Sequence, residues 1–178
     1  MLTRRLDRLS LTPLGLGSLF YWFYWSFVAA YDPFLNVYLA DDRGLTGLQV
    51  GTLAIFSPLT ALILGPFLSA VADRRGWRLR LLQAALGGWI LALLLLRWPQ
   101  TFWGFVPVMI LLAIFRSPTS PIGDGLIAEM AVTHRLSYGA MRLWGSLGFA
   151  VVSIIGGLAW QQVGYGPMFF VAALTAVP

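Results

Sequence analysis

The stretch SPTSPIGDGLIAEM, residues 117–130, decides the fold because it places the carboxylate of Asp124 inside an otherwise apolar run. A second apolar stretch, SYGAMRLWGSLGF at residues 137–149, carries the opposite charge of Arg142. A charge at the centre of a bilayer costs roughly 2.5 to 3.5 kcal/mol on insertion scales, so it persists mainly where it is paired or faces a watery cavity. Asp124 and Arg142 are therefore the leading candidates for a functional pair.

The composition indicates which solvent surrounds the chain. Hydrophobic residues make up 58% and charged residues only 11%, with a mean hydropathy of +0.78. A soluble domain carries about 25% charged residues, so the sequence predicts an integral membrane protein. No cysteine is present and His134 is the single histidine, which excludes disulfides, thiolate catalysis and a zinc site built from histidines. We expect no cofactor.

Apolar segments and helix breakers predict an all-α membrane protein with five complete transmembrane helices and a truncated sixth. The complete helices are expected at about 13–40, 47–71, 79–97, 101–131 and 138–160. Residues 166–178 are apolar but number only about half of the ~20 that a span needs. Residues 1–178 are therefore expected to form one domain that stops inside a helix, through either a sequence fragment or a truncated gene product.

The loop arginines predict the orientation. The net charge of +5 comes from arginine without lysine, and basic residues concentrate in the cytoplasmic loops of membrane proteins. This bias explains the charge better than nucleic-acid binding does. The richly basic segments are the amino-terminal tail, the turn at 74–80 and the turn near Arg135. We therefore expect a multi-pass protein of the cell (inner) membrane with a cytoplasmic amino terminus.

The turn between the second and third predicted helices carries a motif. Residues 69–80, SAVADRRGWRLR, resemble the signature G-x-x-x-D-R-x-G-R-R of the major facilitator superfamily. Ser69 and Trp77 depart from it. Physically, a short glycine turn lets two helices reverse, and neighbouring opposite charges can form switchable ion pairs. The four matching residues are the candidate gating residues: Asp73, Arg74, Gly76 and Arg78.

A second resemblance rests on the opening feature. The pattern S-P-x-x-P-x-x-D at 117–124, followed by Y-G-x-x-R-L-W-G-S at 138–146, resembles the phenylpropionate permease group and, more distantly, the lactose permease-like group. The resemblance implies the amino-terminal six-helix half of a major facilitator transporter, built from two inverted three-helix repeats. It also implies that the residues matching Asp124 and Arg142 pair and contact substrate, with Phe149 close to that site.

Helix geometry allows the same pair. Asp124 lies about nine residues before the turn near residue 135 and Arg142 about five after it, so their depths differ by roughly 6 Å at 1.5 Å per residue. A side chain of arginine can span that difference. A purely structural salt bridge is the alternative, but desolvation offsets much of the stability that a buried bridge gains. We expect a functional pair, with Arg142 clamping an anionic or hydroxylated group.

Asp32 and Arg116 are two further charges at membrane depth. Pro33 frees a helix carbonyl that can line a polar cavity, and a carboxyl away from water holds a proton more readily. Asp32 and Asp124 are therefore the candidate proton-coupling residues, and an ion pair between Asp32 and Arg116 is the equal alternative for Asp32. Asn36 is a further candidate substrate contact.

The predicted function is secondary active transport, not enzymatic catalysis. We expect proton-coupled uptake of a small organic solute, such as an aromatic acid, sugar or nucleoside, by alternating access. Proton-driven efflux is the alternative, and a nonfunctional fragment is another. The start of a phosphotransferase motif, D-G-x-x-A-R, fits poorly because Glu129 occupies its arginine position. The expected partners are the bilayer, the solute, protons and the carboxy-terminal half of the transporter, without nucleic acid.

Overall fold

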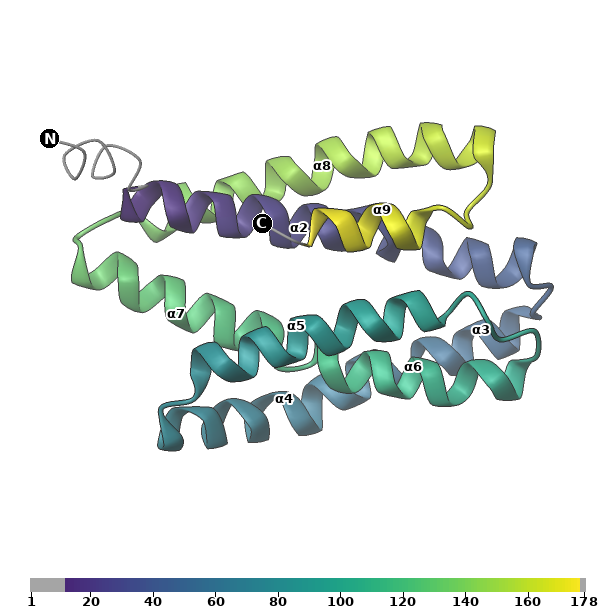
Figure 1. Cartoon of the computed structure of the whole chain (residues 1–178), viewed down its shortest axis with the longest axis horizontal. Coiled ribbons are helices and arrows are strands. Elements are labelled where there is room, and N and C mark those ends of the chain that lie inside the picture. Colours follow the sequence, from purple (N-terminus) through teal and green to yellow (C-terminus); the bar gives the residue numbers. More distant parts are fainter. Residues whose placement is uncertain (1–11, 177–178) are drawn as a thin grey trace, which may run out of the picture.

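The computed structural model describes residues 12–176, and this part of the chain is helical without a strand (Figure 1). Arg4, Arg5 and Arg8 of the basic tail lie outside the described residues. The predicted all-α class is confirmed. The helices are α2 (Pro13–Val37), the π-helical η1 (Tyr38–Asp42), α3 (Gly47–Ala54), α4 (Phe56–Arg75), α5 (Arg78–Leu95), α6 (Phe102–Arg116), α7 (Thr119–Thr133), α8 (Tyr138–Val163) and α9 (Met168–Thr175).

Prolines divide two of the predicted spans. The span expected at 47–71 consists of α3 and α4, which meet at Ile55, and Pro58 follows this break. The span expected at 101–131 consists of α6 and α7, which meet at Ser117 and Pro118. A proline lacks the N–H that would bond four residues back, so the helix bends or breaks there. The break at Pro118 sets the direction of α7, which carries Asp124.

Four helical stretches are long and apolar enough to cross a membrane: Gly47–Arg75, Arg78–Leu95, Phe102–Thr133 and Tyr138–Val163. The first predicted helix, α2, is 25 residues long. It is not one of these four stretches, because its tyrosine, tryptophan and serine residues lower its mean hydropathy. Glycine and threonine set several boundaries. Gly76 ends α4 in the left-handed conformation at φ +66°, and the Thr12 side chain accepts a bond of 3.2 Å from the Gly15 N–H to begin α2.

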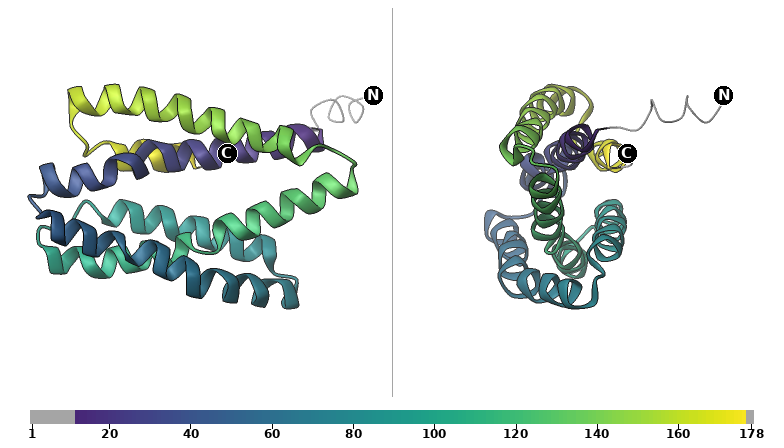
Figure 2. Two further views of the ribbon diagram at one scale, coloured as in Figure 1. Left: turned by 180° about the vertical axis from the view of Figure 1, so that it is seen from behind. Right: turned by 90° about the vertical axis from the view of Figure 1, so that its left-hand side faces the viewer.

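The tertiary arrangement groups the helices in two sets. α2 has its most extensive contact with α8, and α9 packs on α2 as well. The segments from α3 to α6 form the other set, and α7 connects the two (Figure 2). Close approach of α2 and α8 depends on Gly148, because a Cβ there would lie 2.9 Å from the carbonyl oxygen of Trp22.

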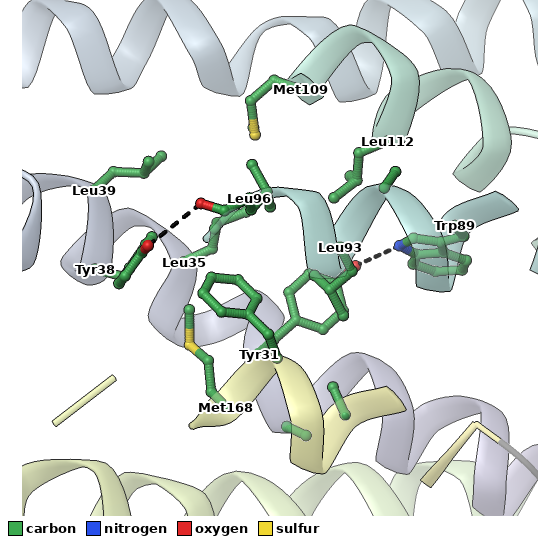
Figure 3. Close-up of a cluster of buried hydrophobic side chains, with 14 of the residues drawn as sticks. Tyr31, Leu35, Tyr38, Leu39, Trp89, Leu93, Leu96, Met109, Leu112 and Met168 are labelled. Atoms are coloured by element: carbon green, nitrogen blue, oxygen red, sulfur yellow. Dashed lines mark hydrogen bonds between the residues drawn. The ribbon is translucent and has the colours of Figure 1, made fainter. Parts of the chain in front are cut away.

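Aromatic and aliphatic side chains from both sets form the main core (Figure 3). Trp89 of α5 and Tyr31 of α2 are fully buried, and the Trp89 Nε1–H donates to the Tyr31 hydroxyl at 2.9 Å. Near the end of α2, the Tyr38 hydroxyl donates to the Leu96 carbonyl at 3.3 Å. These paired polar groups satisfy the buried donors. The core thereby fixes α2, the helix that supplies the candidate residues Asp32 and Asn36.

The arginine-rich turns lie at one end of the bundle. The turn between α4 and α5, the turn between α7 and α8, and the start of α2 share that end in Figure 1. Arg43 and Arg97 belong to the opposite end, where Arg43 Nη2 donates to the Arg97 carbonyl at 2.7 Å. Arg43 also donates from Nε to the Tyr38 hydroxyl at 2.6 Å. The grouping of basic turns follows the pattern that the sequence predicts.

Candidate functional site

Asp124 lies on α7 and is held by hydroxyl groups. Its Oδ1 accepts a hydrogen bond of 2.6 Å from the hydroxyl of Tyr21 on α2. Its Oδ2 accepts one of 3.2 Å from Ser120, one turn earlier on α7. Hydrogen bonds to an ionised acceptor are stronger than neutral ones, so Tyr21 links α2 firmly to α7 at this point.

Arg142 lies on α8 against two aromatic rings of α2. Its guanidinium carbon is 5.1 Å from the centre of the Tyr21 ring and 4.6 Å from that of the Trp25 ring. Cations within about 6 Å of a ring face are attracted by its quadrupole. Tyr21 and Trp25 are four residues apart on α2 and so face the same side.

The expected direct ion pair between Asp124 and Arg142 is wrong for this structure. No salt bridge joins them among residues 12–176. Tyr21 lies between Asp124 and Arg142 and contacts both. Its hydroxyl donates to the carboxylate, and its ring lies beside the guanidinium. The depths of two helices do not indicate a side chain that enters between them from a third helix. Tyr21 lies in an aromatic run, residues 20–25, in which several pairs are three or four residues apart, so spacing alone does not distinguish it.

A second hydroxyl extends this contact. The Tyr138 hydroxyl, at the start of α8, lies 2.9 Å from that of Tyr21. A tyrosine hydroxyl has one proton to donate, and an ionised carboxylate only accepts. While Asp124 is ionised, Tyr21 therefore donates to Asp124 and Tyr138 donates to Tyr21. If Asp124 were protonated, it could donate to Tyr21, and Tyr21 could donate to Tyr138, so the direction of both hydrogen bonds would reverse.

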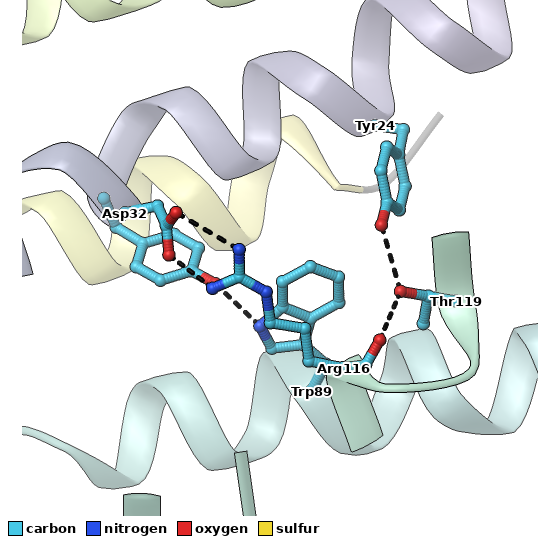
Figure 4. A network of polar contacts seen from close by, with 6 residues as sticks. Tyr24, Asp32, Trp89, Arg116 and Thr119 are labelled. Carbon is cyan, nitrogen blue, oxygen red and sulfur yellow. Dashed lines mark hydrogen bonds and ion pairs between the residues drawn. The ribbon is translucent and has the colours of Figure 1, made fainter. Parts of the chain in front are cut away.

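Asp32 and Arg116 form the ion pair that the sequence left open (Figure 4). The contact is bidentate: Arg116 Nη1 bonds Asp32 Oδ1, and Nη2 bonds Oδ2 at 3.2 Å. The side chains are 31% and 33% exposed, so neither is fully withdrawn from solvent. The Arg116 guanidinium also lies 5.4 Å from the centre of the Trp89 ring.

The break between α6 and α7 is stabilised by side chains. Thr119 Oγ1 donates to the carbonyl of Arg116 at 2.8 Å, and the Tyr24 hydroxyl lies 3.0 Å from the same Oγ1 (Figure 4). Helix ends leave carbonyl groups without helical partners, and Thr119 satisfies one of them. Tyr24 thereby connects α2 to the break between α6 and α7. Arg116 lies before this break and Asp124 after it.

Two pockets adjoin these charges. The larger, of about 570 Å³, includes Arg116, Ser117 and Ser120 together with Tyr24 and Trp25 in its wall. The smaller, of about 240 Å³, is lined by Trp25, Arg142, Gly145, Ser146 and Phe149. Trp25 borders both pockets.

Trp25 and Ser69 leave polar atoms unused at these pockets. Trp25 Nε1 and Ser69 Oγ are buried and have no hydrogen-bond partner among the described residues, and Ser69 lines the larger pocket. Buried polar groups are nearly always hydrogen-bonded in native proteins. The sequence did not identify Trp25 as a site residue, because it lies in a run of aromatic residues that look alike in the sequence.

The other predicted substrate contacts separate. Phe149 lines the smaller pocket, and its ring meets the Trp25 ring edge to face at 6.1 Å. Asn36 is exposed and lines neither of the two pockets. Asn36 follows Asp32 by one turn of α2 and so lies on the same helix face, but outside both pockets.

The predicted gating residues lie at the end of the bundle with the basic turns. Arg78 pairs with Asp73, and its Nη1 donates to Glu129 of α7 at 2.8 Å. The Glu129 side chain is 67% exposed although it takes part in this ion pair. Arg74 is exposed beside Gly76. Arg78 therefore connects the turn between α4 and α5 to α7.

Within residues 12–176, no group of three or more histidine, cysteine, aspartate or glutamate residues could hold a metal ion.

Comparisons with known proteins add family information. The model of the MFS_1 like family matches residues 16–177. The maltose permease of Geobacillus stearothermophilus is 29% identical over 156 residues, which cover 88% of this chain and 40% of that protein. The multidrug resistance protein MdtG of Serratia proteamaculans (strain 568) is 32% identical over 148 residues, 79% of this chain and 35% of that protein. The chain thus spans less than half the length of these relatives.

Proposed function

Because the chain belongs to the MFS_1 like family of the major facilitator superfamily, we propose that it forms one wall of a secondary active transporter. The members of this family are transporters, not enzymes, and the chain is a multi-pass membrane protein. We propose that it carries a small organic solute by alternating access with protons as the coupling ion. A second six-helix half would supply the opposite wall. We place the basic turns on the cytoplasmic side of the inner membrane.

One observation supports this proposal above the others: Arg142 lies in a pocket and has no carboxylate partner among residues 12–176. Its charge is held beside the rings of Tyr21 and Trp25, and cation–π contacts leave the edge of a guanidinium free to donate. Guanidinium groups match carboxylates and hydroxyl pairs bidentately. Arg142 is therefore placed to bind an anionic or hydroxylated solute, with Trp25 and Phe149 as aromatic walls.

Protons are assigned to Asp124 and Asp32. Asp124 holds the Tyr21 hydroxyl while ionised, so its protonation would change a contact that joins α2, α7 and α8. Asp32 holds Arg116 at the edge of the larger pocket, so its protonation would release that cation. In both cases one proton alters a contact between helices, which is what coupling to a conformational change requires.

The gate is assigned to the charges around Arg78. Exposed ion pairs contribute only about 0 to 1 kcal/mol each, so the links from Arg78 to Asp73 and Glu129 can break and re-form at little cost. Such links suit a turn that must separate from α7 when the pocket opens. Gly76 supplies the reversal that brings Arg78 toward Asp73.

The direction of transport has two candidates. Similarity to the maltose permease and to the permease groups favours uptake, which is our proposal. Similarity to MdtG, described as a multidrug resistance protein, favours proton-driven efflux as the second candidate. A gradient of either sign tests both directions in one preparation.

The test is a transport assay. The protein encoded by the full open reading frame that contains this chain is purified and reconstituted in liposomes, and a proton gradient is imposed. Maltose and 3-phenylpropionate serve as probes of uptake, and ethidium serves as the probe of efflux. Asp124→Asn and Arg142→Gln should reduce proton-driven transport at least about tenfold, the loss expected from about 1.4 kcal/mol of binding or coupling energy. Asp42→Asn, at an exposed position outside both pockets, is the matched control.

Normal transport by both site variants at wild-type expression would refute the assignment of the site. Transport that does not respond to the proton gradient would refute proton coupling and leave the binding roles to be judged from the affinity of Arg142→Gln. Export of ethidium without import of the other probes would replace uptake by the second candidate.

A further inference from the structure

A groove separate from both pockets lies between the end of α4 and the start of α5. It has a volume of about 430 Å³ and is lined by Leu68, Val71, Ala72, Trp77, Arg80 and Leu81. Its walls are apolar, and an arginine stands at one edge. We propose that this groove binds an anionic phospholipid, with an acyl chain along the apolar walls and the phosphate at Arg80. The inference does not depend on the proposed transport function.

The shape of the groove follows from its residues. Leu68 and Val71 are three residues apart on α4 and lie on one face, and Leu81 comes from the first turns of α5. Ala72, only 1% exposed, packs where α5 approaches and leaves a hollow between the larger side chains. The left-handed turn at Gly76 brings α5 back beside α4. The groove is thus a fixed product of the hairpin.

The charge at the groove is not neutralised by an ion pair within the described part of the chain. Arg78, on the same turn, is occupied by Asp73 and Glu129. No salt bridge within residues 12–176 involves Arg80 or Arg75. Phosphate oxygens form strong charge-assisted hydrogen bonds with guanidinium groups, and basic residues next to a membrane surface attract anionic lipids. The free cation therefore indicates an anionic headgroup.

Trp77 places the groove relative to the membrane. It begins α5 at the edge of the groove, its side chain is exposed, and the guanidinium carbon of Arg75 lies 5.0 Å from the centre of its ring. Tryptophan prefers the interface between headgroups and hydrocarbon. With Trp77 at that level, the charged edge meets the headgroups and the apolar walls extend toward the hydrocarbon. A free phosphate ion would gain nothing from Leu68, Val71 and Leu81, whereas a phospholipid uses both parts.

The experiment measures which lipids remain bound, after purification, to the protein that the full open reading frame encodes. The protein is equilibrated with micelles containing equal amounts of phosphatidylglycerol and phosphatidylcholine, and bound lipids are counted by native mass spectrometry. Wild-type protein should retain phosphatidylglycerol in preference. Arg80→Gln should lower the apparent affinity for phosphatidylglycerol about fivefold, the effect of one basic side chain near a charged surface, and leave phosphatidylcholine unchanged.

Three further variants make the result specific. Arg80→Lys, which keeps the charge, should retain the preference, and Leu81→Gln should weaken retention of both lipids because it makes an apolar wall polar. Arg97→Gln, at the opposite end of the bundle, is the matched control and should behave as wild type. Equal retention of the two lipids by wild type would overturn the proposal, and so would an unchanged preference in Arg80→Gln. Displacement of the lipid by millimolar inorganic phosphate alone would also overturn it, since a simple anion site would then suffice.

Discussion

Gly148 should tolerate alanine poorly because it lies where α8 approaches the backbone of α2 closely. A Cβ at this position would lie 2.9 Å from both the Trp22 carbonyl oxygen and Ser26 Oγ, whereas ordinary contacts begin at 3.4 Å. Relief at both atoms requires a movement of 3.4 − 2.9 = 0.5 Å. The serine hydroxyl can rotate, but the carbonyl belongs to the α2 backbone. We therefore expect Gly148→Ala to push the two helices apart.

The magnitude combines two opposing effects. Overpacking a close contact costs about 1 to 3 kcal/mol, and replacing glycine by alanine in a helix interior gains up to about 1 kcal/mol. The net expectation lies between no loss and a loss of about 3 kcal/mol in the free energy of unfolding. Gly87 on α5 is the matched control, because a Cβ there has no atom within 4 Å among the described residues. Gly87→Ala should be neutral or stabilising by up to about 1 kcal/mol.

The assay is reversible unfolding in mixed micelles with increasing denaturing detergent, followed by circular dichroism. The difference between the two alanine variants isolates the cost of the close contact, since both gain the same helix propensity. It should be about 1 to 3 kcal/mol. Equal stabilities within about 0.5 kcal/mol would refute the inference that Gly148 sets the distance between α2 and α8.

Two further predictions use the same unfolding assay. Asp32→Asn should cost about 2 to 3 kcal/mol, less than the roughly 3 to 5 kcal/mol typical of a fully buried pair, because the Asp32 and Arg116 side chains are 33% and 31% exposed. The double variant with Arg116→Gln should lose less stability than the sum of the single losses. Additive losses would contradict the ion pair. Tyr21→Phe should cost about 1.5 kcal/mol because it removes a hydrogen bond to the charged Asp124, and Tyr24→Phe, which loses only a neutral bond, should cost about 1 kcal/mol or less. A Tyr24 variant less stable than the Tyr21 variant would contradict that order.

Local sequence signals predicted the elements well. Apolar length identified the spans, and Gly76 marked the turn that ends α4. Each of these features acts through the covalent properties of one residue or through the hydropathy of a continuous segment. The departures were also local: the span expected at 47–71 breaks at Ile55, near Pro58.

The candidate site was only partly predictable. Asp124, Arg142, Asp32 and Arg116 stood out because a charge at membrane depth is costly wherever its partner lies. Whether Asp32 meets Arg116 could not be decided from the sequence, because it depends on where α2 lies relative to α6. The aromatic residues of α2 gave no comparable signal, since any of them can pack in a core or face lipid.

The sequence by itself determined that this chain is a helical membrane protein of the major facilitator superfamily, with charges that need partners. Hydropathy, helix breakers and motifs are properties of contiguous residues, so they need no knowledge of packing. The tertiary structure alone decided the partners: Tyr21 stands between Asp124 and Arg142, while Arg116 meets Asp32 directly. These choices depend on the rotation and separation of helices that are distant in the chain, which no local pattern encodes.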